Sequence, residues 1–182
     1  MIREDTAFLG VYVLKPEIYR DNRGFFLETF REEYFEKVDL PGNYDQDNLS
    51  VSKKGVIRGL HFQTGESAQK KLILVCSGKI LDVVVDIRRE SSTFGKYLSF
   101  KLSAQEPNML YIPEGYAHGF SVLSDEAVVY YKCDVVYNPE KERGIRWNDP
   151  DLGINWEVED PVLSQKDKNQ PLLSDLTKEE LF

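Results

Sequence analysis

Short apolar runs separated by turn residues fill most of the chain. Alternating positions within these runs predict strands, at residues 10–15, 24–30, 56–63, 71–76, 79–87, 97–102, 108–112, 117–123 and 127–136. Helical patterns are few: residues 31–40 predict one helix ended by Pro41-Gly42, and Thr177 to Glu180 have the capping-box spacing of a frayed turn. The pattern is typical of an all-β protein, an antiparallel sandwich or barrel with a few short peripheral helices.

The same alternation predicts which polar side chains share a face with the core. Lys71 falls on the same face as the apolar positions Ile73 and Val75. Tyr131 groups with apolar neighbours in its run, whereas Tyr130 groups with a lysine. Lys71 and Tyr131 are therefore candidates for polar groups that point inward.

The run from residue 81 to residue 88 is apolar on one face and charged on the other. Asp82, Asp86 and Arg88 share the charged face. A buried charge is costly unless it is paired, so these side chains need partners if their face lies inside.

The composition indicates one folded domain over residues 1–182. Lys and Arg number 23 against 31 Asp and Glu, a net charge of −8, which argues against nucleic acid as a partner. No run approaches the roughly 20 apolar residues that span a bilayer, so no membrane partner is expected. The N-terminus lacks the pattern of a secretory signal, which favours a cytoplasmic location. Cys76 and Cys133 are expected to be small buried residues.

The chain has only two histidines, and both lie in conspicuous contexts: His61 in Arg-Gly-Leu-His-Phe-Gln and His118 in Pro-Glu-Gly-Tyr-Ala-His-Gly. Histidine is the side chain best suited to exchange protons near neutral pH. Arg58 precedes His61 by three residues, which strict alternation would place on opposite faces. Gly59 between them permits a bulge that would bring both into one cavity.

The turn that ends at His118 is also typical of metal-binding sandwiches. Such a site usually draws on several histidines and a carboxylate, and this chain has two histidines in total. We therefore expect no metal, although a site of His and carboxylate ligands stays open at this point.

An ordered set of motifs closely resembles the dTDP-4-dehydrorhamnose 3,5-epimerases. The motifs cover nearly the whole chain, at residues 21–28, 46–50, 58–63, 71–72, 85–88, 91–95, 112–120, 147–150 and 163–167. The resemblance implies a cupin jelly roll, a homodimer with exchanged N-terminal strands, a peripheral tail at 168–182 and no cofactor. It also implies a dTDP-sugar substrate in dTDP-L-rhamnose biosynthesis: dTDP-4-dehydro-6-deoxy-glucose, epimerised at C3 and C5.

The resemblance implies four catalytic residues. His61 matches the base and Asp167 the carboxylate that orients it. Lys71 matches the cation beside the C4 oxygen, where charge develops as the proton leaves. Tyr131 matches the acid that returns a proton to the opposite face, with Tyr130 as its competitor.

The resemblance also implies a set of substrate-binding residues. Cations would bind the diphosphate, with one of them coming from the partner subunit; the remaining residues would contact the base and the sugars. The implied residues are Arg58, Lys166, Gln46, Asn48, Tyr137, Glu142, His118 and Phe26, with Arg23 and Glu28 from the partner. Asp82 is a lesser candidate, as polar support for the histidines.

Four alternatives remain at this point. Two are close relatives: an epimerase acting at C3 or C5 alone, and a 3,4-ketoisomerase. The third is a metal-dependent cupin dioxygenase, which a chelator would inactivate. The fourth is a non-catalytic module that binds sugar nucleotides, in which a base would be dispensable.

Overall fold

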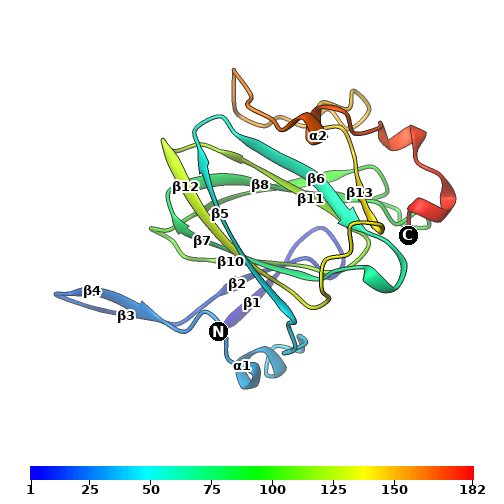
Figure 1. Ribbon diagram of the computed structural model, residues 1–182. Helices are drawn as coiled ribbons and strands as arrows, with labels where there is room; N and C mark the ends of the chain where they lie inside the picture. Colours follow the sequence, from blue (N-terminus) through cyan, green and yellow to red (C-terminus); the bar gives the residue numbers. More distant parts are fainter.

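Two antiparallel sheets face each other in the computed structural model, which describes residues 1–182 (Figure 1). The first has six strands in the order β1 (Ile2–Asp5), β2 (Tyr12–Lys15), β10 (Met109–Ile112), β7 (Lys71–Ser77), β12 (Glu126–Cys133) and β5 (Gln46–Lys53). The second has five, in the order β13 (Glu142–Gly144), β6 (Ile57–Gln63), β11 (Tyr116–Val122), β8 (Lys79–Asp86) and β9 (Tyr97–Ser103). A strand occurs in every run where the pattern predicts one, and the all-β sandwich is confirmed.

The main core lies between the two sheets and follows the period-two pattern of the strands. Inward residues of β7, β10 and β12 meet those of β8, β9 and β11, and Tyr131 packs at the edge of this cluster. The cluster contains Phe8, Val11, Ile73, Val75, Ile80, Val84, Leu102, Leu110, Ile112, Tyr116, Phe120, Val122, Ala127 and Val129. Burial of these apolar side chains is what holds the sheets together.

Each sheet also has a covered outer face. Helix α1 (Glu32–Glu36) places Phe35 against Leu72 and Leu74 of the six-stranded sheet. The segment from residue 144 to the C-terminus covers the five-stranded sheet with Ile145, Trp156 and other apolar residues. It contains α2 (Gln165–Lys168) and two 3₁₀ turns, Leu173–Asp175 and Lys178–Glu180. A third 3₁₀ turn, Gly65–Ser67, follows β6.

The C-terminal tail lies on the outside of the sandwich but is firmly attached to it. The Thr177 and Glu180 positions form the expected capping box. Leu181 and Phe182 pack against the outer cluster of the five-stranded sheet, and the backbone N–H of Phe182 donates to the Ile87 carbonyl. The prediction that this turn is frayed is therefore wrong.

Helix α1 is shorter than the pattern predicts. It ends at Glu36, and Asp39 adopts a positive φ of 56°, a left-handed conformation that stops the helix. The N–H of Leu40 donates back to the Phe35 carbonyl and closes the turn. No helix of the structure is long and apolar enough to cross a membrane.

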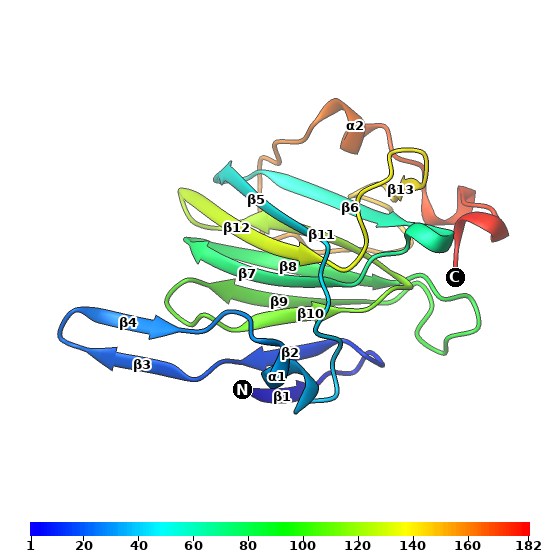
Figure 2. The ribbon, with the colours of Figure 1, turned by 60° about the horizontal axis from the view of Figure 1, so that its bottom comes forward.

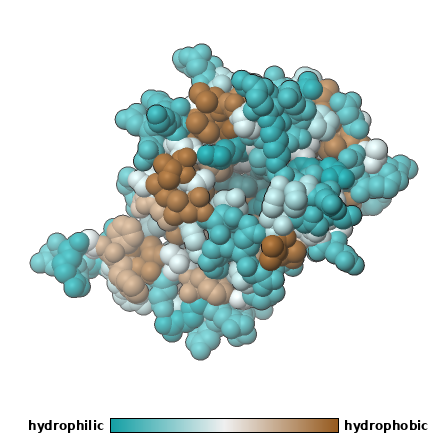
Figure 3. Space-filling view, in the orientation of Figure 1, coloured by the Kyte–Doolittle hydropathy of each residue, from teal (hydrophilic) through white to brown (hydrophobic).

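A two-stranded hairpin, β3 (Ile18–Asp21) and β4 (Gly24–Leu27), projects from the body of the protein (Figures 1 and 2). It belongs to neither of the two large sheets. Its aromatic residues are largely exposed, with Phe26 at 64% and Tyr19 at 52%. Figure 3 shows a brown, apolar stretch along the hairpin, behind a hydrophilic tip. An arm of this kind buries little surface of its own, so it is suited to contact another molecule.

Cys76 departs from the expectation of burial: it is exposed, whereas Cys133 is buried. Cys76 shares its face of β7 with Leu72 and Leu74, which α1 and its flanking segments cover. Cys76 lies beyond these two residues, toward the end of the strand, and does not belong to the cluster that covers them.

The charged face of β8 does lie inside, and its charges are paired as burial requires. Asp82 and Asp86 are both fully buried. Asp82 bonds to His118, and Asp86 accepts hydrogen bonds from Arg88, Ser91 and Thr93. Burial acts to raise the pKa of Asp86, but these hydrogen bonds outweigh it and bring the pKa to about 2.

Replacing Asp86 with Asn is expected to lower the free energy of unfolding at pH 7 by about 2 kcal/mol. The folded pKa lies below the ordinary value, so this stabilisation is complete above pH 4 and is lost as pH falls toward about 2. Urea unfolding of both proteins at pH 7 and pH 3 measures the effect. A stability difference that is the same at both pH values would contradict this origin.

Candidate active site

A cavity of about 300 Å³ lies between the sheets and brings all four predicted catalytic residues together. Strands β5, β7 and β12 form one wall, β6 and β11 the other, and the start of α2 closes one side. The lining residues are Ser50, Arg58, His61, Lys71, His118, Phe120, Tyr131, Ser164, Lys166 and Asp167. Ser50, Phe120 and Ser164 were not predicted as site residues.

A bulge in β6 brings Arg58 and His61 to the same face, as predicted. His61 pairs with His118 and Arg58 pairs with Phe120. Strand β6 therefore has one more residue than β11 between these two pairs. Gly59 allows it: its φ is +123°, and a Cβ there would lie 2.6 Å from the Gly119 Cα. The peptide bond between Gly59 and Leu60 is cis.

His61 and Asp167 form a hydrogen-bonded dyad, with Nε2 of His61 2.6 Å from Oδ1 of Asp167. Ser164 caps α2 by accepting from the Asp167 N–H, which orients the carboxylate. Burial acts to raise the pKa of Asp167, but its interactions with His61, Ser164 and Lys166 together outweigh this effect and leave the pKa below its ordinary value. An ionised carboxylate can only accept, so Nε2 carries the hydrogen and Nδ1 is left with the lone pair of a base.

A second dyad lies on the neighbouring strands. His118 Nε2 is 3.0 and 2.9 Å from the two carboxylate oxygens of Asp82. Burial raises the pKa of Asp82, and the attraction to His118 and Lys71 only partly offsets this effect. Asp82 therefore supports one histidine, His118, while Asp167 supports the other.

Lys71 and Tyr131 face the cavity from the six-stranded sheet, as the alternation of residues along their strands predicted. Burial lowers the pKa of the Lys71 ammonium and raises the pKa of the Tyr131 phenol. Neither side chain makes a hydrogen bond within the chain. The adjacent Lys70 instead pairs with Asp134 at 2.8 Å. Tyr130 lies on the opposite face, beside Lys132.

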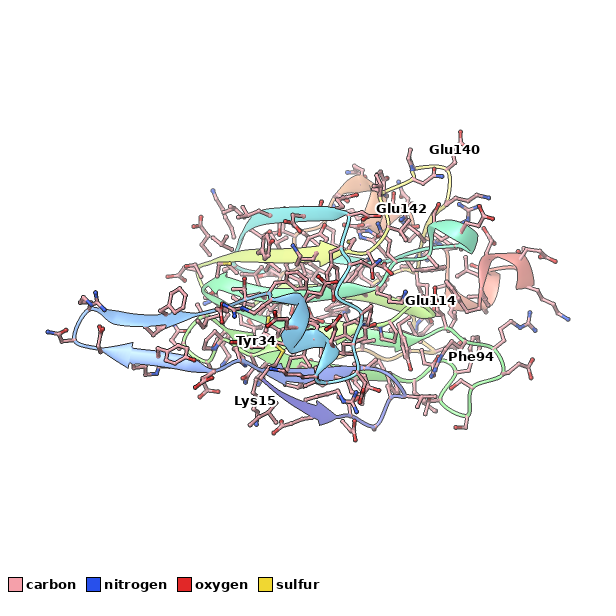
Figure 4. All side chains as sticks on the ribbon, turned by 90° about the horizontal axis from the view of Figure 1, so that it is seen from below. Lys15, Tyr34, Phe94, Glu114, Glu140 and Glu142 are labelled. Carbon is pink, nitrogen blue, oxygen red and sulfur yellow. The ribbon has the colours of Figure 1, made fainter.

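The other predicted binding residues form a hydrogen-bonded rim that begins at Lys166, which lines the cavity. Glu142 accepts from Lys166 and, at 2.5 Å, from the Tyr137 hydroxyl. The opposing effects of burial and these two hydrogen bonds leave the pKa of Glu142 below its ordinary value. Glu142 turns inward from its segment, whereas Glu140 points outward (Figure 4).

Two more of these residues lie beside this group on β5. The Gln46 amide donates to Asn48 at 2.8 Å, and its oxygen accepts from the Tyr137 N–H at 2.7 Å. Arg58 donates to Ser52 at 2.9 Å and is exposed at the cavity. The rim therefore combines a tyrosine ring, amides, a carboxylate and cations. These are groups that can bind a nucleotide.

Arg23, Phe26 and Glu28 are not near this cavity in their own chain. Arg23 pairs with Asp21 at the tip of the hairpin, and Glu28 pairs with Arg31 at its base. Arg23 and Glu28 are the residues expected to reach the site of a partner subunit. Phe26 was expected at the site without that assignment, and the structure places it on the exposed hairpin instead. Nowhere in the chain do three His, Cys, Asp or Glu side chains gather in a group that could hold a metal ion.

The fold and the site define a jelly-roll protein with an acid–base cavity, in which a His–Asp dyad faces a tyrosine and a lysine. A family model described as dTDP-4-dehydrorhamnose 3,5-epimerase matches residues 5–175. The chain belongs to this family.

Individual relatives agree with this assignment. The chain is 47% identical over 167 residues to the dTDP-4-dehydrorhamnose 3,5-epimerase of Methanothermobacter thermautotrophicus, covering 90% of each chain. A Legionella pneumophila epimerase solved with dTDP-4-keto-L-rhamnose has a TM-score of 0.94 and 41% identity, covering 99% of this chain and 96% of its own. The predicted cupin jelly roll is confirmed by this likeness.

A more distant neighbour has a different specificity. It is a 3′-monoepimerase from Streptomyces bikiniensis solved with dTDP-quinovose. Its TM-score is 0.87 at 35% identity, covering 93% of this chain and 86% of that one. The fold therefore serves both double and single epimerisation, and only the site can separate them.

Proposed function

We propose that this protein is an isomerase that epimerises dTDP-4-dehydro-6-deoxy-glucose at C3 and C5 to dTDP-4-dehydro-L-rhamnose. The observation that carries the proposal is the arrangement of the His61–Asp167 dyad and Tyr131 on opposite walls of one cavity, with Lys71 beside them. A base on one side of a sugar ring and an acid on the other is what inversion of a carbon centre requires.

Each inversion consists of two proton transfers. Nδ1 of His61 takes the hydrogen from the carbon next to the C4 ketone, and the electron pair of the C–H bond moves into the ring to form an enolate. The charge collects on the C4 oxygen, where the Lys71 ammonium stabilises it. Tyr131 then gives its hydroxyl proton to the opposite face of the same carbon. Exchange with solvent then removes the added proton from His61 and returns one to Tyr131. Because the C4 ketone activates both C3 and C5, the restored groups can serve both centres.

The rim residues support recognition of a nucleoside diphosphate. Arg58 and Lys166 supply cations for its two phosphates, in keeping with the preference of guanidinium for phosphate oxygens. Gln46, Asn48 and Tyr137 would bind the base, by hydrogen bonds and by stacking, while Glu142 would bind the nucleotide sugar. His118, fixed by Asp82, would contact the substrate near the ketone.

The projecting hairpin supports a homodimer as the working form. Its aromatic side chains are exposed, and Arg23, Phe26 and Glu28 have no role in the cavity of their own chain. Exchange of these strands between two copies would cover the aromatic surface and deliver a third cation to each diphosphate. A cytoplasmic location stays a prediction of the sequence.

The pH dependence of the rate is expected to separate the roles of Lys71 and Tyr131. Burial moves the pKa of Lys71 down toward neutral pH and moves that of Tyr131 up, away from it. We expect kcat to fall on the alkaline side with Lys71, and Lys71→Arg to move this limb to higher pH because arginine stays charged. Profiles of kcat against pH for both proteins measure this; coincident alkaline limbs would contradict it.

Conversion of dTDP-4-dehydro-6-deoxy-glucose by protein treated with a chelator tests the proposed activity. The product is expected to have the L-rhamno configuration at C3 and C5, formed at an undiminished rate. Inversion at C3 alone would instead match the monoepimerase, and loss of activity that a divalent metal restores would favour a metal-dependent enzyme.

A further inference from the structure

Ser50 on β5 lines the cavity, and its hydroxyl has no hydrogen-bond partner within the chain. Its Oγ is buried, and only the Tyr44 hydroxyl shares this condition in the whole chain. An unpaired buried hydroxyl costs about 1–3 kcal/mol, and such a group in a natural protein needs an explanation.

The strand around Ser50 has the reverse of the usual polarity. Leu49 and Val51 point outward and are 64% and 52% exposed, whereas the inward positions are polar. Two of these inward side chains have partners: Asn48 bonds to Gln46, and Ser52 bonds to Arg58. Strand β5 thus gives up apolar contacts to present polar groups to the cavity, and Ser50 is the group left free to bind a ligand.

The register places Ser50 between two parts of the proposed site. Tyr131 lies opposite Asn48, and Ser50 is the next inward residue of β5, opposite Val129. The following inward residue, Ser52, holds Arg58. Ser50 therefore lies between the acid that serves the reacting carbons and the guanidinium that serves the diphosphate.

We infer that Ser50 is a specificity residue that hydrogen-bonds the C2 hydroxyl of the substrate hexose, an inference that rests on the proposed function. C2 lies between C1, which carries the diphosphate, and C3, which inverts. Of the oxygens on the ring carbons, the one at C1 belongs to the diphosphate linkage, the one at C3 changes sides and the one at C4 faces Lys71. The C2 hydroxyl keeps its configuration throughout, so a serine on a rigid strand can hold it before and after each inversion. A hydroxyl can both donate to it and accept from it.

Steady-state kinetics of Ser50→Ala on the normal substrate and on its 2-deoxy analogue test this inference. On the normal substrate kcat/KM is expected to fall about tenfold. On the 2-deoxy analogue wild type and variant are expected to be equal, because the partner hydroxyl is missing. The Kd for dTDP is expected to be unchanged, and the thermal midpoint of the variant not lower, because no internal hydrogen bond is lost.

Ser121→Ala is the matched control. Ser121 is also buried, but its hydroxyl donates to the Trp156 carbonyl at 2.6 Å, away from the cavity. Its loss should lower the thermal midpoint and leave kcat/KM unchanged. An unchanged kcat/KM for Ser50→Ala, an equal loss on both sugars, or weaker dTDP binding would each overturn the assignment to the C2 hydroxyl. A wild-type protein that converts neither sugar would contradict the proposed function instead.

Discussion

Replacement of His61 with Ala is expected to lower kcat for epimerisation by at least about 10²–10⁴-fold, the usual contribution of a general base. Nε2 of His61 contacts Asp167 at 2.6 Å, which leaves Nδ1 free to act as the base. The other histidine is also tied to a carboxylate, but it is held by both oxygens of Asp82 on the adjacent strand. Product formation followed by NMR measures the loss.

Binding of dTDP provides the control for this variant. The proposed nucleotide contacts, among them Arg58, Lys166 and Tyr137, do not involve the imidazole, so the Kd for dTDP is expected to stay close to that of the wild type. Asp167→Asn is expected to give a smaller loss of kcat, because it removes the orientation of the base and leaves the base in place. A His61→Ala protein with wild-type kcat would remove His61 from the mechanism.

Replacement of Tyr131 with Phe is expected to separate proton exchange from inversion. The base still removes the proton, and the enolate still forms beside Lys71. No acid is then present on the opposite face of the sugar ring. Deuterium from solvent should therefore enter the substrate with retention of configuration, while formation of inverted product falls by about 10²-fold or more. NMR in deuterated water reports both quantities in one sample.

Tyr130→Phe is a matched control for this experiment. Tyr130 is the next residue of β12, but it lies on the other face of the sheet, where its hydroxyl accepts from Lys132 at 3.4 Å. This variant is expected to exchange and invert at wild-type rates. Normal inversion by Tyr131→Phe would move the role of the acid to another group.

Strand positions were predictable where a strand has at least one apolar face, as in β7 and β12. Strands β1, β3, β5 and β13 were not predicted. Strand β5 was missed because its inward face is polar, lining the cavity, and its apolar residues Leu49 and Val51 point outward. The hairpin strand β3 has no core to face in its own chain, so no alternation marks it. In β5 local pattern fails because the cavity sets the residue types.

Parts of the candidate site followed from local pattern. The alternation of residues along the strands placed Lys71 and Tyr131 inward. Gly59 indicated the bulge that brings Arg58 and His61 to the same face of β6. The His61–Asp167 pair, 106 residues apart in sequence, depended on the family resemblance, since no local pattern joins such distant residues. Ser50 falls in the motif at residues 46–50, but nothing in the sequence marks it as a binding residue, because its lack of a partner exists only in the folded chain.

The net charge of −8 is compatible with an anionic ligand because the cations are local. Arg58, Lys71 and Lys166 line one cavity, while most acidic side chains lie elsewhere on the surface. The electrostatic field in a cleft depends more on the charges that line the cleft than on the net charge of the whole protein. The two histidines both lie in this same cavity, which accounts for their conspicuous sequence contexts.

The most direct test of the account is NMR of dTDP-4-dehydro-6-deoxy-glucose incubated with the wild-type protein in deuterated water. Solvent deuterium is expected at both C3 and C5, with inversion at both carbons. Deuterium at a single carbon would make the protein a single-centre epimerase, and a substrate that gains deuterium at neither carbon would contradict the proposed chemistry.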